Sequence, residues 1–219
     1  MTELGGPPDR GDRPIAVLDY GIGNLRSAEK ALQYLGARAS LTSDPAVARR
    51  AAGVVLPGVG AFGRCMAALR ESGLEPVVRE AVEDGRPFLG ICVGLQMLFD
   101  SSEESPEISG LGLVGGVVRR LVPGVPGLKV PHMGWTRVEV TGGSALFSDL
   151  PERPFVYFVH SYAPVPEDED CVAARADHGG SLVAAVERGA LWGTQFHPEK
   201  SGANGLALLS NFVTACQAA

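Results

Sequence analysis

Apolar and polar positions along residues 14–100 alternate in blocks that predict strands followed by helices. The short apolar runs IAVLDY, GVVLP and PFLGI are separated by segments in which apolar residues recur every three or four positions. One face of the first segment carries Leu25, Ala28, Leu32 and Leu35. ARASLT predicts another strand, and Asp44 followed by Pro45 is typical of a helix start. Strands that alternate with helices predict a parallel sheet covered by helices.

From about residue 115 the pattern becomes rich in strands joined by Gly-containing turns. The predicted strands are GVVRRLV, TRVEV, FVYFVHSYAP, CVAARAD, LVAAVE and LWGTQF. ERGA between the last two predicts a hairpin, and GLALLSNFVTAC predicts a closing amphipathic helix. We therefore expect an α/β domain with a central, largely parallel mixed sheet flanked by helices, and an antiparallel, β-rich second half.

Length and composition fit one folded domain. The chain has 219 residues, of which 45% are hydrophobic and 20% charged. We expect residues 14–219 to form the domain. Residues 1–13, MTELGGPPDRGDR, are polar and rich in Gly and Pro, so we expect a disordered tail there.

Charge and cysteine spacing narrow the function classes. The net charge of −6 argues against a generic nucleic-acid or anionic-membrane surface, since both favour a basic face. No apolar run is long enough to span a bilayer, which favours a cytoplasmic protein. Four scattered cysteines without a CxxC pair argue against a zinc site and a disulfide framework. We expect neither a metal nor a cofactor.

The strongest local signal for chemistry is Gly90-Ile91-Cys92-Val93-Gly94, where an apolar run meets a helix-like pattern near Gly94. In a nucleophile elbow, glycines flank the reactive residue because a Cβ would collide with neighbouring backbone. A helix N-terminus also favours the thiolate over the thiol. Cys92 is therefore the candidate nucleophile; the plainer interpretation is a small buried hydrophobic residue.

A thiolate needs a base and a proton donor for the leaving amine, and GTQFHPE supplies both candidates after a predicted strand. His197 is the expected base. Glu199, two residues on, can accept a hydrogen bond from the imidazole and fix its tautomer. A His-Pro-Glu stretch alone is more often a surface turn, so this prediction depends on the cysteine elbow.

The glycine-rich PGVG after the strand GVVLP is the candidate oxyanion site. The amides of Val59 and Gly60 can turn inward there, and the amide of Val93 is the second donor that an elbow provides. On its own, PGVG would be an ordinary turn.

Together, GICVGLQ, PGVG, HSY at 160–162 and GTQFHPEKS resemble the class I, triad-type glutamine amidotransferases. The resemblance covers nearly the whole chain after Pro14. DYGIGNLRS and KVPHMGW look more specifically like the glutaminase subunits of imidazole glycerol phosphate synthases. The resemblance implies hydrolysis of glutamine to glutamate and ammonia in histidine biosynthesis. It also implies a heterodimer in which a barrel-shaped cyclase subunit receives the ammonia.

The same resemblance implies roles for further residues. The ends of glutamine would be held by Gly60, Gln96, Ser161 and Tyr162. The face that docks the cyclase would include Asn24, His132, Trp135 and Lys200. One departure is Thr136, which follows PHMGW where the subfamily usually has Asn. Any side-chain contact at that position is therefore in doubt.

Two other functions stay open on sequence alone. One is the glutaminase subunit of another ammonia-channelling synthase, such as that of pyridoxal phosphate synthesis, because its triad chemistry would be identical. The other is a scaffolding subunit that kept the fold and lost the reaction. The GxGxxG string at residues 110–115 follows a polar loop rather than a strand, which argues against a dinucleotide site. The acidic stretch SSEESPE is interpreted as a solvated loop.

Overall fold

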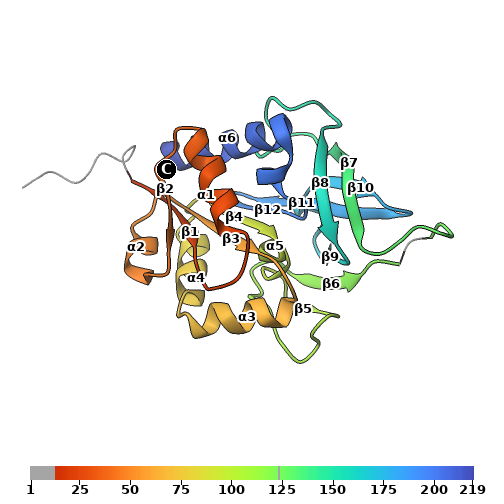
Figure 1. Ribbon diagram of the computed structural model, residues 1–219, viewed down its shortest axis with the longest axis horizontal. Coiled ribbons are helices and arrows are strands. Elements are labelled where there is room, and N and C mark those ends of the chain that lie inside the picture. The colour runs from red at the N-terminus through yellow and green to blue at the C-terminus, as the bar shows by residue number, and fades with distance from the viewer. Residues whose placement is uncertain (1–12, 123) are drawn as a thin grey trace, which may run out of the picture.

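A nine-stranded mixed sheet forms the centre of the computed structural model, which describes residues 13–122 and 124–219 (Figure 1). The strand order is β2-β1-β3-β4-β12-β11-β10-β7-β8. The disordered tail expected at residues 1–13 lies outside the described residues except for Arg13. No helix in the described part combines the length and apolar character that a membrane crossing requires.

One half of this sheet is parallel, as the strand–helix alternation predicted. It consists of β1 (Ile15–Leu18), β2 (Ala39–Thr42), β3 (Gly53–Gly58), β4 (Phe88–Cys92) and β12 (Leu191–Thr194). Most residues of these strands are buried, because helices cover both faces. The carboxyl ends of β3, β4 and β12 meet at one edge, and in such sheets ligands bind outside the carboxyl ends of strands.

The other half is antiparallel, which confirms the prediction for the second half of the chain. It contains β7 (His132–Val140), β8 (Phe155–His160), β10 (Val172–Asp177) and β11 (Ser181–Arg188). The predicted hairpin joins β11 to β12. A second sheet of three strands is formed by β5 (Ser101–Ser102), β6 (Gly116–Arg120) and β9 (Tyr162–Pro166).

Helices lie on both faces of the parallel half (Figure 1). One face carries α1 (Leu25–Tyr34) and the closing helix α6 (Gly202–Ala218), and the opposite face carries α3 (Phe62–Glu71) and α4 (Glu75–Glu83). The buried residues of α1 are Leu25, Ala28 and Leu32, the apolar stripe expected from the sequence. The short helix α2 (Pro45–Arg49) begins as predicted, with the Asp44 side chain accepting the Ala46 amide at 2.8 Å.

Two elements differ from the sequence prediction. The helix expected after the elbow is a single turn, α5 (Val93–Gln96). The backbone carbonyls of Met97, Leu98 and Phe99 instead accept hydrogen bonds from amides of residues 111–114. These three side chains are fully buried, so the segment forms part of the core without continuing as a helix.

The second difference is that FVYFVHSYAP forms two strands. β8 belongs to the large sheet and β9 to the small one, with the break at Ser161. The Ser161 carbonyl accepts the Leu121 amide at 2.9 Å, and β9 then pairs with β6. Residues 159–162, on either side of this break, line the same pocket as Cys92.

Candidate active site

Cys92 ends β4 in a backbone conformation that is unusual for a residue with a side chain. Its φ is 55° and its ψ is −110°, and α5 begins at the next residue. Such strain is typical of functional positions. The flanking glycines are required: a Cβ on Gly90 would lie 2.8 Å from the Gly94 carbonyl oxygen, and one on Gly94 would collide with the Leu56 carbonyl oxygen. The strand–nucleophile–helix geometry predicted for the elbow is therefore present.

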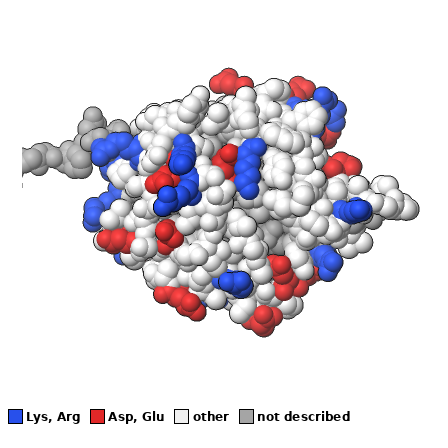
Figure 2. All heavy atoms as spheres, in the orientation of Figure 1, with Lys and Arg blue, Asp and Glu red and all other residues white. Residues whose placement is uncertain are grey.

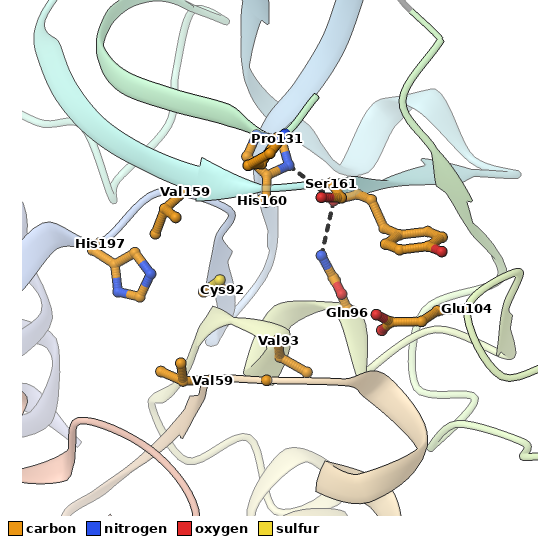
Figure 3. A pocket seen from close by; sticks show the side chains of 12 residues that line it. Val59, Cys92, Val93, Gln96, Glu104, Pro131, Val159, His160, Ser161 and His197 are labelled. Atoms are coloured by element: carbon orange, nitrogen blue, oxygen red, sulfur yellow. Dashed lines mark hydrogen bonds between the residues drawn. The ribbon is translucent and has the colours of Figure 1, made fainter. Parts of the chain in front are cut away.

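His197 and Glu199 face each other in the turn after β12. His197 Nδ1 lies 2.8 Å from Glu199 Oε1, and their side chains are only 2% and 3% exposed. With Nδ1 engaged, the free ring nitrogen is Nε2, which is buried and has no hydrogen-bond partner among the described residues. Figure 3 shows the His197 ring and the Cys92 sulfur lining the same space. The imidazole is thus held in an orientation that presents Nε2 to the pocket.

The surroundings of His197 favour its charged form. Burial opposes the charge, but the interactions of the ring with Cys92 and Glu199 outweigh burial and raise the pKa of His197 to about 9. Near neutral pH the site therefore holds an imidazolium that can stabilise a thiolate and give a proton to a leaving group.

Ser201 fixes the turn that carries both residues. Its buried hydroxyl donates to the His197 carbonyl at 2.6 Å and accepts the Tyr157 amide at 2.9 Å. The His197 amide in turn donates to the Tyr157 carbonyl at 3.0 Å. The His-Pro-Glu turn is therefore attached to Tyr157 of β8 by two hydrogen bonds and braced internally by a third, which limits movement of the imidazole.

A pocket of about 300 Å³ opens above the elbow at the carboxyl edge of the sheet (Figure 3). Its lining residues include most of the predicted site: Val59, Gly60, Cys92, Val93, Gln96, Ser161, Tyr162 and His197. Glu199 lies behind His197. The structure thus brings together residues from β3, β4, β8–β9 and β12 that are far apart in the sequence.

The PGVG segment lies next to the nucleophile, because Gly58 pairs with Cys92 across the parallel strands β3 and β4. Gly60 has a φ of +106°, a conformation that favours glycine. The Cys65 thiol lies 3.6 Å from the Val59 carbonyl oxygen as a hydrogen-bond donor. In a trans peptide the following amide points the opposite way, so the Gly60 N–H points away from Cys65.

Gln96 ends α5 with its amide in a defined orientation. Its Nε2 donates to the Tyr162 carbonyl at 2.9 Å and to Gln195 Oε1 at 3.0 Å. Because both N–H groups are used, Oε1 is the atom left for a ligand. Figure 3 shows this oxygen on the side of Glu104.

Two site residues were missed in the sequence analysis. Glu104 was interpreted as part of a solvated loop, yet it lines the pocket and its Oε2 accepts the Phe62 amide at 2.7 Å. Gln195 is fully buried, and its Nε2 lies 3.7 Å from Cys92 Sγ. No sequence pattern marks which carboxylate of an acidic loop points inward. Gln195 could have been found from the sequence, since it lies two positions before the candidate base.

The placement of His132 differs from the expectation that it contacts a partner. Its side chain is 3% exposed, with Nδ1 3.0 Å from His160 Nε2 and Nε2 2.8 Å from Thr136 Oγ1. His160 Nδ1 donates to the Tyr162 carbonyl at 2.8 Å. Burial, followed by the charge of neighbouring histidines, lowers the pKa of His132 to about 3. The side chain of His132 therefore supports the site from within, and Thr136 supplies the contact that the sequence left in doubt.

The other residues expected at a partner interface are on the surface. Trp135 is 54% exposed and packs edge-on against Tyr157, with ring centroids 6.1 Å apart. Lys200 and Asn24 are exposed. A Cβ on Gly202 would lie 3.7 Å from the Trp135 ring, and Lys200 directly follows Glu199, so both residues lie close to the catalytic turn.

Comparison with known proteins agrees with this fold and site. The family model of the class-I glutamine amidotransferases matches residues 16–216, and the chain belongs to this family. A solved structure described as a glutamine amidotransferase superposes with a TM-score of 0.70 at 25% identity, covering 92% of this chain and 98% of the other. PurLQS from Thermotoga maritima shares the fold, with a TM-score of 0.72 at 23% identity over 92% of this chain and 98% of the other.

Closer relatives carry a more specific name. The chain is 49% identical to the imidazole glycerol phosphate synthase subunit HisH of Moorella thermoacetica, over 91% of this chain and 94% of the relative. It is 52% identical to the HisH subunit of Thermosynechococcus vestitus, over 91% of this chain and 95% of the relative. The resemblance drawn from the motifs is thereby confirmed.

Proposed function

We propose that this chain is the glutamine amidotransferase subunit of an imidazole glycerol phosphate synthase, and that it hydrolyses glutamine with Cys92, His197 and Glu199. The observation that carries the proposal is the strained Cys92 opposite the buried His197–Glu199 pair, with the cysteine and histidine lining one pocket. The identity of about half to HisH subunits supports the same assignment.

In the first half of the reaction the Cys92 thiolate attacks the side-chain carbonyl of glutamine. A C–S bond forms, and the carbonyl electrons move to oxygen, where amides of PGVG and Val93 donate to the oxyanion. His197 gives its proton to the amide nitrogen, the C–N bond breaks, and ammonia leaves a thioester on Cys92. Glu199 stabilises the imidazolium and fixes its orientation.

In the second half a water molecule attacks the thioester. His197, now neutral, accepts the water proton, the C–S bond breaks, and glutamate leaves while the thiolate is restored. No cofactor enters either half. The balance is one glutamine and one water converted into one glutamate and one ammonia.

Recognition of glutamine follows from the polar groups around the pocket. Gln96 Oε1 and the Glu104 carboxylate are both acceptors, which suits the α-ammonium group of an amino acid. The backbone at Gly60, Ser161 and Tyr162 lies elsewhere on the pocket wall and supplies contacts to the remaining polar groups. A ligand with a charged amino end and a side-chain amide fits this distribution.

We propose that the ammonia is passed to a cyclase subunit; the HisH relatives are named as a subunit of a synthase, which supports a partner protein. A docking face is available beside the pocket, where Met133, Trp135 and Phe155 expose large apolar surface on β7 and β8. Figure 2 shows little charge over β8, whereas acidic and basic groups alternate elsewhere on that side. Lys200 adds a charge at the edge of this face.

The two alternatives left open by the sequence lose support. The compared relatives at about 50% identity are HisH subunits, which disfavours the glutaminase of another synthase such as that of pyridoxal phosphate synthesis. A scaffolding role is disfavoured because the nucleophile, base and carboxylate are all present and arranged for reaction. We also propose that residues 14–219 act as one catalytic domain in the cytoplasm.

The test is covalent trapping with a glutamine-like electrophile, diazo-oxo-norleucine, followed by peptide mass spectrometry. One modification is expected, on the peptide that contains Cys92, and glutamine should protect against it. Cys65, Cys171 and Cys216 are buried and do not line the pocket, although the Cys65 thiol contacts the Val59 carbonyl beside it, and they should accept Ala with most activity kept. Labelling mainly at another cysteine would overturn the assignment of the nucleophile.

A further inference from the structure

Gln195 occupies a position that the triad does not account for. It follows the last residue of β12, which runs parallel to β4 with Thr194 opposite Ile91. The next position along the register therefore places Gln195 beside Cys92. The backbone N–H of Gln195 donates to the Ala184 carbonyl at 2.8 Å, and none of the surface of Gln195 is exposed. The backbone thus holds the side chain against the nucleophile.

The two ends of the Gln195 amide contact different parts of the site. Nε2 lies 3.7 Å from Cys92 Sγ, within hydrogen-bond distance for sulfur. Oε1 accepts from Gln96 Nε2 at 3.0 Å. A neutral side-chain amide donates to a thiolate through its nitrogen and accepts through its separate oxygen. An ionised carboxylate can only accept, and a hydroxyl uses one atom for both roles.

The contact with Gln96 determines which atom Gln96 presents to a ligand. Oε1 of Gln195 and the Tyr162 carbonyl are both acceptors, and together they take both N–H groups of Gln96. If Gln96 rotated by half a turn, its oxygen would face two acceptors in a buried place, which is costly. Gln195 therefore keeps Gln96 Oε1 directed at the pocket.

We propose that Gln195 is a further functional residue of this site: it donates a hydrogen bond to the attacking sulfur and positions Gln96 for the amino end of glutamine. The inference rests on the proposed function, in which Cys92 attacks glutamine. One side chain thus contacts both the reacting sulfur and the residue that recognises the amino end of the substrate. A side chain that only filled space would need neither contact.

Two substitutions separate the two contacts. Gln195→Glu keeps an acceptor for Gln96 but replaces the donor to sulfur by a carboxylate oxygen. Gln195→Met has a similar length and provides neither a donor nor a good acceptor. Thr194→Val is the matched control, because Thr194 is the neighbouring buried residue and its hydroxyl has no partner among the described residues.

The full chain is assayed in complex with its cyclase for kcat and KM, and alkylation of Cys92 by iodoacetamide is followed against pH. Gln195→Glu should slow alkylation near neutral pH by about 10- to 100-fold, the range for a hydrogen bond to a charged group. Its alkylation midpoint should move to higher pH, with KM within about threefold of wild type because the Gln96 contact is kept. Gln195→Met should slow alkylation and also raise KM by about tenfold.

The control Thr194→Val should match wild type in both measurements. Wild-type protein that neither hydrolyses glutamine nor reacts at Cys92 would defeat the proposed function itself. Active wild type with alkylation unchanged in both Gln195 variants would overturn the inference. The inference would also be overturned if alkylation slowed equally and KM rose equally in both variants, because that result indicates a merely structural role. If Gln195→Met does not fold, the pH profile and KM of Gln195→Glu decide the question.

Discussion

Glu199 Oε1 lies 2.8 Å from His197 Nδ1 across a turn of two residues, with both side chains removed from solvent. The contact fixes the imidazole and leaves Nε2 for the sulfur and the substrate. Glu199→Gln keeps the shape but loses the charge, so kcat should fall by about 10- to 100-fold, the value of a charged hydrogen bond. The kcat of His197→Ala should fall further, because the proton carrier itself is lost. Equal losses in the two variants would argue against an orienting role for Glu199.

The raised pKa of His197 predicts the alkaline limit of activity. Its pKa of about 9 lies above the ordinary value of 6.5, so the imidazolium persists through neutral pH. Glutamine hydrolysis should decline as the pH rises through about 9, when the proton for the leaving amine is lost. Glu199→Gln removes one cause of the raised pKa, so the decline should begin at lower pH. A pH profile of kcat/KM for both proteins measures this.

The same shift has a consequence for stability with a definite sign. A group whose pKa is higher in the folded protein stabilises the fold below its unfolded pKa of 6.5, and this contribution is lost as the pH rises through about 9. His197→Gln should therefore show a smaller loss of Tm than wild type between neutral pH and pH values above 9. Equal losses of Tm in His197→Gln and wild type would contradict the ion pair between His197 and Glu199.

The packing of the elbow predicts an asymmetric response to added methyl groups. A Cβ on Gly94 collides with the Leu56 carbonyl oxygen, whereas one on Gly142 meets nothing within 4 Å. Gly94→Ala should cost about 1–3 kcal/mol and lower Tm by about 2–12 °C. Gly142→Ala should leave Tm nearly unchanged. Thermal denaturation of both variants checks the difference, and an unaffected Gly94→Ala would show that β3 and α5 are not in close contact.

Much of this site could be predicted from local sequence signals. The elbow glycines, the His-Pro-Glu turn and PGVG each require particular residue types at fixed spacing, so their chemistry is visible without the fold. The alternation of strands and helices likewise predicted that β3 and β4 lie side by side. The structure places Gly58 opposite Cys92, as that interpretation required.

The remaining features depend on long-range packing that no local pattern contains. The helix after Cys92 stops at Gln96 because residues 97–99 hydrogen-bond with residues 111–114. His132 was expected at a partner interface, but its side chain is buried against His160 of the neighbouring strand. Glu104 enters the pocket from a loop whose composition suggested only solvent.

The exposed apolar face beside the pocket predicts where the cyclase docks. Trp135→Ala and Lys200→Ala should each weaken assembly, and loss of a buried aromatic anchor of about 2 kcal/mol corresponds to about 30-fold in Kd. Neither should prevent Cys92 from reacting with a strong electrophile. Tyr34→Ala is the control, because Tyr34 is an exposed aromatic at the end of α1. Titration calorimetry with purified cyclase measures the effect, and unchanged affinity in both variants would place the interface elsewhere.

Partner binding should also switch on hydrolysis. The PGVG segment, with Gly60 at a φ of +106°, can rest with its oxyanion donors turned away from the pocket. Losing one such donor lowers rates by about 10²- to 10³-fold in other enzymes, so stoichiometric cyclase should stimulate glutamate release at least about 10²-fold. Equal rates of glutamate release with and without cyclase would contradict activation by the partner.

In the proposed function, Cys92 releases ammonia from glutamine and another subunit consumes it. The most direct measurement is imidazole glycerol phosphate formation by the Cys92→Ala complex, assayed once with glutamine and once with a high concentration of ammonium salt at alkaline pH. We expect no product with glutamine and near wild-type product formation with ammonium. Synthesis from glutamine by this variant, or failure of ammonium to restore synthesis in an assembled complex, would overturn the proposed role of Cys92.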